Sequence, residues 1–205
     1  MKLYQVTVLT VPVGTTPQAL PRIQEHEATV QRAGRLLACW YAEIGVLNRI
    51  MLIHSYDGEA ARAADHVRLL ETGNPYGIGD LVSAMQVDTY APFPFLPNVE
   101  PGEAGPFYEV RVYGLKPDGL APTIEAWHRA VGPRTELSPL TVAMYALDGA
   151  APRFMNIWPY RSLDARQHAR NAAVQQGIWP PKGGPAHLTT LESGIWLPAA
   201  FSPLR

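Results

Sequence analysis

The sequence is poor in cysteine, in net charge and in long apolar runs, and each shortage excludes a class of protein. Cys39 is the only cysteine, so neither an intramolecular disulfide nor a cysteine-rich zinc site can form. The 17 basic and 18 acidic side chains give a formal net charge of -1, so no overall basic field is present to hold nucleic acid or an anionic membrane. No apolar run reaches the roughly 20 residues that span a bilayer.

The remaining composition is that of a globular protein. Hydrophobic residues make up 47% of the chain and charged residues 17%, which is enough apolar surface to build a core. The opening residues alternate like a strand and lack the charged head and apolar run of a signal peptide. We therefore expect a cytoplasmic protein whose partner is a small, neutral molecule.

An internal repeat is the most informative pattern. LYQVTV, beginning at Leu3, matches FYEVRV, beginning at Phe107, at an offset of 104 residues. Identical residues recur at the same offset along the chain: Tyr41 and Tyr145, Arg49 and Arg153, Met51 and Met155, Tyr56 and Tyr160, Arg62 and Arg166. Because identity at one constant offset is hard to obtain by chance, the chain is predicted to hold two copies, residues 1–102 and 103–205, joined by a linker rich in proline and glycine.

Each copy has the same predicted order of elements, strand–helix–strand–strand–helix–strand. Period-two alternation predicts the strands, and proline in the first turn marks the start of each first helix, at Pro17 and Pro122. Asp57 and Ser162 are the predicted N-caps of the second helices. The strands are expected at Leu3–Leu9, Leu37–Ile44, Arg49–Tyr56 and Leu81–Tyr90, then at Phe107–Tyr113, Thr141–Leu147, Arg153–Tyr160 and His187–Trp196.

This order is the ferredoxin-like βαββαβ unit, an α+β fold. Such a sheet carries both helices on one face and must bury the other face against something. Two fused units can bury each other and form a pseudo-dimeric α+β barrel of eight strands. A barrel of that size is either filled by side chains or holds one small ligand.

One run carries a family resemblance. WYAEIGVLNRIMLIHSYD, from Trp40 to Asp57, together with the LYQVTV opening, resembles the NIPSNAP family. The resemblance implies a dimeric α+β barrel, with two such domains fused in this chain. It implies no single activity, since the wider superfamily includes cofactor-free oxygenases, isomerising and decyclising enzymes, haem-handling enzymes and ligand binders.

Alternation along the strands separates two faces in the first copy. Tyr41, Glu43, His54 and Tyr56 share one face, which we assign to the barrel interior, while the aliphatic face is assigned to the helices. Glu43, His54 and Tyr41 are the predicted catalytic residues, because burial can shift the pKa values of such groups toward the working pH, where they can transfer protons. The alternative is a carboxylate in water and a hydrogen-bonded core histidine.

The second copy adds a predicted substrate-binding set. Glu109 and Arg111 lie two residues apart on one face, where they could pair with each other, so a structural ion pair is an alternative to ligand binding. Leu147 stands at the position of Glu43, so a site that uses that carboxylate would exist only once. The predicted substrate-binding residues are Tyr56, Glu109, Arg111, Tyr145, Asn156 and Trp158, although aromatics such as Tyr145 and Trp158 are also typical barrel fillers.

No metal or cofactor is expected. The six histidines show none of the spacings of zinc enzymes, and Gly183 and Gly184 do not have phosphate-loop spacing. A lone histidine ligand to haem stays open, as does association of chains through their outer faces. Two functions stay open as well: a cofactor-independent enzyme that moves protons on a small apolar or aromatic molecule inside the barrel, and a non-catalytic binding or interaction module with a filled barrel.

Overall fold

The predicted order of elements is confirmed in the computed structural model, which describes residues 2–205. The first repeat contains β1 (Leu3–Thr10), α1 (Thr16–Thr29), β2 (Arg35–Ile44), β3 (Arg49–Tyr56), α2 (Glu59–Glu71), the short turn η1 (Pro75–Gly77) and β4 (Ala84–Pro92). The second repeat contains β5 (Phe107–Leu115), α3 (Leu120–Leu137), β6 (Val142–Ala146), β7 (Arg153–Tyr160), α4 (Leu163–Gln175), the short turn η2 (Gly184–His187) and β8 (Leu188–Pro198).

The strands close into one antiparallel barrel in the order β1-β3-β2-β8-β5-β7-β6-β4. Within each repeat the first strand lies between the third and the fourth, as in a ferredoxin-like sheet. The two sheets join at β2–β8 and at β4–β6, so the fourth strand of each repeat pairs with the second strand of the other. The tandem α+β barrel expected from the repeat is therefore confirmed.

Aromatic and aliphatic side chains from both repeats fill the middle of the barrel. Trp40 from β2 stacks on Tyr108 from β5, with ring centroids 4.2 Å apart, and the Trp40 indole N–H donates to the carbonyl of Leu204. Tyr4 and Met144 are also buried in this cluster. The interior core is thus shared, and neither sheet could bury its inner face alone.

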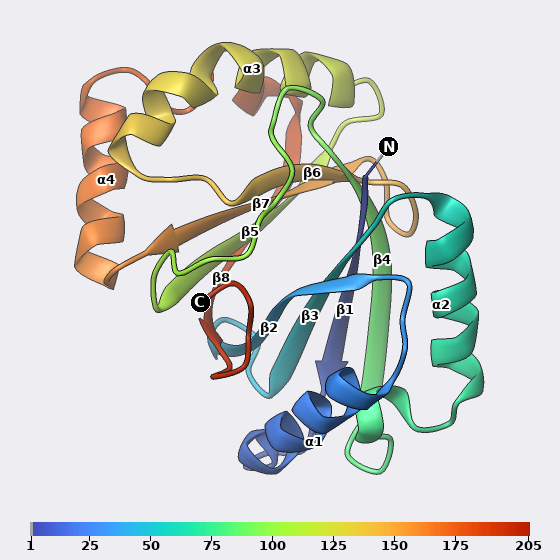
Figure 1. Cartoon of the computed structure of the whole chain (residues 1–205). Helices are drawn as coiled ribbons and strands as arrows, with labels where there is room; N and C mark the ends of the chain where they lie inside the picture. The colour runs from blue at the N-terminus through green and yellow to red at the C-terminus, as the bar shows by residue number, and fades with distance from the viewer. Residues whose placement is uncertain (1) are drawn as a thin grey trace.

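The helices lie outside the barrel, one pair on each repeat (Figure 1). Ala19 and Ile23 on α1 pack on the outer face of β1 and β3, in a second core with Leu52. A third, aromatic core lies between α3 and the outer face of β7, where Trp127 packs against Phe154. Each repeat therefore has a layer between sheet and helices that is separate from the barrel interior. No helix in the part of the chain that the structure describes is long and apolar enough to cross a membrane.

The two predicted N-caps have different outcomes. The Ser162 side chain accepts a hydrogen bond from the backbone N–H of Ala165 and caps α4, as predicted. The prediction for α2 is wrong, because Gly58 occupies the N-cap position and Asp57 instead accepts a hydrogen bond from Lys2. Pro159 is the second-last residue of β7, which pairs with β5 through Tyr160 without a register shift.

Candidate functional site

The polar strand residues face the helices rather than the barrel interior. On β3, Met51 and Ile53 point into the barrel, and His54 points the other way, toward α1. The predicted interior placement is therefore wrong for the whole set of Tyr41, Glu43, His54, Tyr56, Glu109, Arg111, Tyr145, Asn156 and Trp158. The physical reason is that charged side chains on the helices supply the partners that these polar groups need when buried, whereas the barrel centre offers few.

A small hollow lies in the barrel interior. It has a volume of about 170 Å³, and its walls include Val8, Met51 and Trp196. An ion pair between Asp88 and Arg153, 2.7 Å apart, lies at its edge. None of the nine predicted site residues lines it.

Tyr41 and Glu43 are separated from His54. They lie on the outer side of β2, beside Pro17 and Leu20 at the start of α1, and line an open surface hollow. Glu43 is exposed there, and His54 does not line that hollow. The structure therefore does not bring the three predicted catalytic residues into one pocket.

The predicted substrate-binding residues fall into two places. Tyr56 is buried beside Leu3 and Ala91, and Tyr145 packs against the same group from the second repeat. In the outer layer of the second repeat, Glu109 accepts hydrogen bonds from Arg111, Arg166 and Ser193, so the predicted pairing of Glu109 with Arg111 is present. Asn156 and Trp158 lie in the same layer, where the Trp158 indole N–H donates to the Asn156 side-chain oxygen at 2.7 Å.

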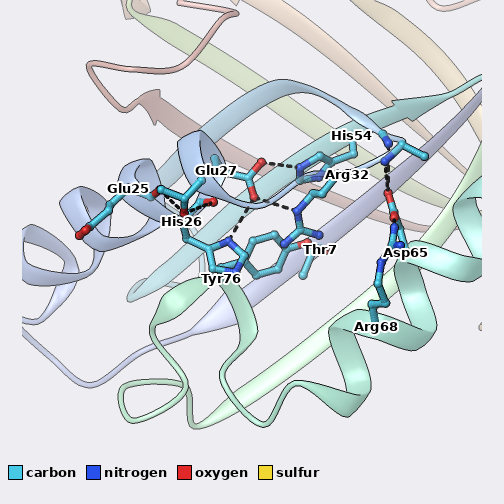
Figure 2. Close-up of polar contacts among 12 residues, drawn as sticks. Thr7, Glu25, His26, Glu27, Arg32, His54, Asp65, Arg68 and Tyr76 are labelled. Carbon is cyan, nitrogen blue, oxygen red and sulfur yellow. Dashed lines mark hydrogen bonds and ion pairs between the residues drawn. The ribbon is translucent and has the colours of Figure 1, made fainter.

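His54 takes part in a buried polar cluster that the strand pattern alone does not reveal. Its Nε2 lies 2.9 Å from Oε2 of Glu27, which comes from the last turn of α1 (Figure 2). The His54 side chain is fully buried, and the Glu27 side chain is 9% exposed. We call Glu27, His26, Arg32, His54 and Tyr76 the Glu27 cluster.

Glu27 is shared by two histidines and an arginine. Arg32, in the loop that follows α1, places its Nε 3.3 Å from Glu27 Oε1. Nδ1 of His26 lies 3.8 Å from the same oxygen. Figure 2 shows the carboxylate between these three side chains, with Tyr76 below. The helix end, the following loop and β3 therefore converge on one carboxylate.

The charges of the cluster follow from these contacts. Burial alone would raise the pKa of Glu27, but the hydrogen bond and charge of His54, followed by the charge of Arg32, outweigh it and hold the pKa below its usual value. Glu27 is therefore ionised at neutral pH, and Nε2 of His54 carries the hydrogen that it donates. Burial and the Arg32 guanidinium lower the pKa of His26, more than Glu27 raises it, so the His26 ring is neutral.

Tyr76 closes the floor of the cluster. It is completely buried, its hydroxyl donates to Thr7 Oγ1 at 3.0 Å, and burial raises its pKa to about 12, so it keeps its proton. The Arg32 guanidinium lies over its ring, 4.7 Å from the centroid. Tyr76 also has a φ of 54°, a left-handed conformation that costs energy for an aromatic residue and that is enriched at functional sites.

A pocket of about 360 Å³ opens beside the cluster, between the end of α1 and α2. His26, Arg32 and Tyr76 line it from the cluster, and Asp65 and Leu69 line it from α2. Asp65 is held in place because it accepts hydrogen bonds from the backbone N–H groups of Ala33 and Gly34. Among residues 2–205, no group of three or more histidine, cysteine or acidic side chains is arranged to hold a metal ion.

Sequence reasoning found one member of the cluster, His54, and missed the others. The signal that could have found Glu27 is its place on α1, four residues after Ile23, on the stripe that carries the buried residues of the helix. A charge on a buried stripe needs a partner, and a histidine on a neighbouring strand is a suitable one. Nothing in the local sequence around Arg32 or Tyr76 indicates that they reach the same place.

The fold and the outer clefts define a class of protein: tandem ferredoxin-like units that form one α+β barrel. The family model described as NIPSNAP matches residues 4–97 and 108–203, which is most of both repeats. The chain therefore belongs to the NIPSNAP family, as two tandem copies of its domain.

Curated relatives agree with this assignment. The chain is 22% identical over 198 residues to Protein NipSnap homolog 2 of Mus musculus, covering 92% of this chain and 68% of that protein. It is 28% identical over 118 residues to the protein of the same name from Danio rerio, covering 55% of this chain and 40% of that one. The chain thus spans between 40% and 68% of the length of these two relatives.

Solved structures show the same fold at low sequence identity. A putative monooxygenase from Lactobacillus acidophilus matches with a TM-score of 0.68 and 9% identity, covering 96% of this chain and 93% of that one. An anthrone oxidase-like protein matches with a TM-score of 0.63 and 11% identity, covering 97% and 91%. At these identities the likeness concerns the fold alone.

Proposed function

We propose that the protein is an enzyme that removes a proton from a small aromatic or otherwise apolar carbon acid, in the pocket beside the Glu27 cluster. The observation that carries the proposal is the ionised Glu27 carboxylate, shared by two histidines and an arginine next to a pocket of about 360 Å³. Pockets for small molecules start at about 300 Å³ and combine apolar walls with a few polar groups.

His26 is the base in this proposal. A neutral imidazole accepts a proton, and a nearby carboxylate stabilises it once it becomes charged. Nδ1 of His26 lies 3.8 Å from Glu27 Oε1, too far for a hydrogen bond but close enough for the carboxylate to stabilise the imidazolium, and the His54 hydrogen bond fixes the carboxylate from the other side. The charge that the base acquires is thus balanced by a carboxylate that is itself held in place.

Arg32 has the complementary role. Removing a proton next to a carbonyl group creates negative charge on the carbonyl oxygen, and a fixed cation close by stabilises that charge. The Arg32 guanidinium lines the pocket and is held over the Tyr76 ring, so its position is set before the substrate arrives. Tyr76 keeps its hydrogen bond to Thr7 and acts as a wall.

The names of the two solved neighbours suggest a probe. Anthrone is an aromatic ketone whose methylene group loses a proton readily, and a resulting carbanion is open to attack by oxygen. The experiment follows deuterium exchange at the anthrone methylene by NMR in D₂O, with oxygen uptake as a second readout. We expect exchange above the buffer rate, and a loss of about 10²- to 10⁴-fold in His26→Gln, the usual contribution of a general base.

His168→Gln is the matched control, because His168 is an exposed histidine on α4, far from α1 in the chain. It should exchange anthrone at the wild-type rate. Exchange at the wild-type rate in His26→Gln, or no exchange above buffer in the wild type, would remove the assignment of His26 as a base for this class of substrate. Glu43→Gln distinguishes the two predicted sites, since Glu43 lies outside this pocket and should leave exchange unchanged.

A further inference from the structure

The cleft between sheet and helices exists twice, but the two copies differ in chemistry. At the offset of 104 residues, Trp158 takes the place of His54 and Val131 the place of Glu27. Thr7 lies on the first strand of the first repeat, and Arg111 stands at the same position in the second repeat. The second cleft therefore has a tryptophan and a valine in place of the histidine–carboxylate pair, and an arginine in place of a threonine.

A second pocket, of about 280 Å³, lies in this cleft between the outer face of β5 and β7 and the helices α3 and α4. Its walls include Tyr113, Trp127, Phe154 and Trp179. Trp127 and Trp179 meet edge to face, with centroids 4.8 Å apart, and Tyr113 and Phe154 do the same at 5.2 Å. A flat ring of a ligand can pack against such side chains either edge to face or offset-stacked, the two arrangements that aromatic pairs prefer.

The aromatic wall is fixed from behind. Arg134, only 2% exposed, lies over the Trp158 ring at 4.3 Å and over Trp179 at 5.9 Å. Its guanidinium also donates to Ser138 at 2.7 Å. Trp179 is therefore held by stacked and edge-on neighbours, so binding a flat ligand requires little ordering of side chains.

Positive charge is in excess beside this pocket. Arg111 and Arg166 both donate to Glu109, and among residues 2–205 no other carboxylate pairs with them. Arg170 also lines the pocket and is half-buried, and its side chain makes no hydrogen bond or ion pair with any residue from 2 to 205. Burial, followed by repulsion from Arg111, lowers the pKa of Arg170, which is the direction expected for a cation that lacks a partner.

We propose that this second pocket binds a small aromatic carboxylate, with the ring among Trp127, Phe154 and Trp179 and the carboxylate on Arg170. A planar guanidinium matches a carboxylate through two parallel hydrogen bonds, and the single negative charge reduces the excess held by Arg111, Arg166 and Arg170. The site is independent of the Glu27 cluster.

The probe is 2-naphthoate, and binding is measured by isothermal titration calorimetry on the full chain. We expect 2-naphthoate to bind, and the neutral 2-naphthamide, which has the same ring, to bind at least about tenfold more weakly, because hydrogen bonds between two charged groups are stronger than those to a neutral amide. Decanoate, a flexible aliphatic carboxylate, should also bind more weakly, since it cannot stack on the rings.

Arg170→Gln is the main variant, because the Arg170 side chain has no hydrogen-bond or ion-pair partner in the described part of the chain, so its loss should not disturb the fold. It should weaken 2-naphthoate about 10- to 100-fold and leave 2-naphthamide unchanged. Arg129→Gln, which changes an exposed arginine on α3 that pairs with Glu125, is the matched control and should bind like the wild type. Glu27→Gln should also bind like the wild type, which separates this site from the proposed proton-transfer site.

Three results would overturn the proposal. Equal affinity for naphthoate and naphthamide would show that the arginines do not select charge. Unchanged affinity in Arg170→Gln would show that the carboxylate lies elsewhere. Tighter binding of decanoate than of naphthoate would show that the pocket takes aliphatic chains rather than flat rings.

Discussion

Glu27 and His26 are neighbours in the sequence, yet their surroundings act on them in opposite ways. Glu27 is stabilised in its charged form by His54 and Arg32, whereas His26 is stabilised in its neutral form by burial and by the same Arg32. The Arg32 guanidinium thus lowers the pKa of both groups, which favours the ionised carboxylate of Glu27 and the neutral imidazole of His26. This combination keeps a base neutral beside a fixed negative charge at neutral pH.

The lowered pKa of His26 has a consequence for stability that can be measured. Because the folded-state pKa lies below that of the unfolded chain, near 6.5, the unfolded chain takes up the proton first as the pH falls. The free energy of unfolding should therefore drop on acidification from about pH 7 to about pH 5, and it should drop less in His26→Gln. Urea unfolding at a series of pH values tests this.

Glu27 adds to the same trend at lower pH. Its folded-state pKa is also depressed, so its contribution is present above the unfolded value of about 4.3 and is lost as the pH falls through the folded value.

Glu25→Gln, which changes an exposed carboxylate on the same helix, is the control and should follow the wild-type curve. A His26→Gln curve parallel to the wild type would show that His26 does not gain or lose a proton on unfolding in this range.

The second helices of the two repeats, α2 and α4, differ in how their N-termini are capped. Ser162 caps α4 by accepting the Ala165 N–H, while the matching end of α2 begins at Gly58 and has no side-chain cap. Ser162→Ala should therefore lower the free energy of unfolding by about 1 kcal/mol, or the melting temperature by about 2–4 °C. Thermal unfolding followed by circular dichroism measures it.

Asp57→Ala is the control from the other repeat. Its carboxylate pairs with Lys2 at the surface, where the Asp57 side chain is 94% exposed, and such pairs contribute little. We therefore expect no measurable change in the free energy of unfolding. A larger loss for Asp57→Ala than for Ser162→Ala would contradict the assignment of the two caps.

The elements were predictable from the sequence because their signals are local. Arg153–Tyr160 was expected from alternation and is the observed span of β7, and the capping serine was recognised by type and position. The face of each strand that meets the helices was not predictable in this way. Alternation separates His54 from Ile53, but only the arrival of Glu27 from α1, 27 residues away, decides which of the two faces the helices.

At the scale of the molecule, duplication places two equivalent clefts on one barrel and frees them to diverge. The shared interior constrains both repeats, because Trp40 of one stacks on Tyr108 of the other. The outer clefts are not shared, so His54 could be kept in one and replaced by Trp158 in the other without loss of closure. A polar pocket and an aromatic pocket on one chain are the result.

The repeat boundary leads to a prediction about assembly. A chain of residues 1–102 alone would expose the edges of β2 and β4, which in the full barrel pair with β8 and β6, and would also expose the apolar face around Trp40. Because an uncovered apolar sheet face and free edges favour association, we expect this half to form a homodimer in which β2 of one copy pairs with β4 of the other. Light scattering after size-exclusion chromatography gives the mass.

Trp40→Ala in the same half should weaken that dimer, because its indole reaches across to the other sheet and truncating a buried tryptophan costs about 3–5 kcal/mol. An exposed change such as Glu25→Gln should leave the dimer intact. A half that is monomeric and unfolds cooperatively would mean that one sheet and its two helices bury enough apolar surface alone, and barrel closure would then be a consequence of tethering two stable domains rather than the condition for folding either of them.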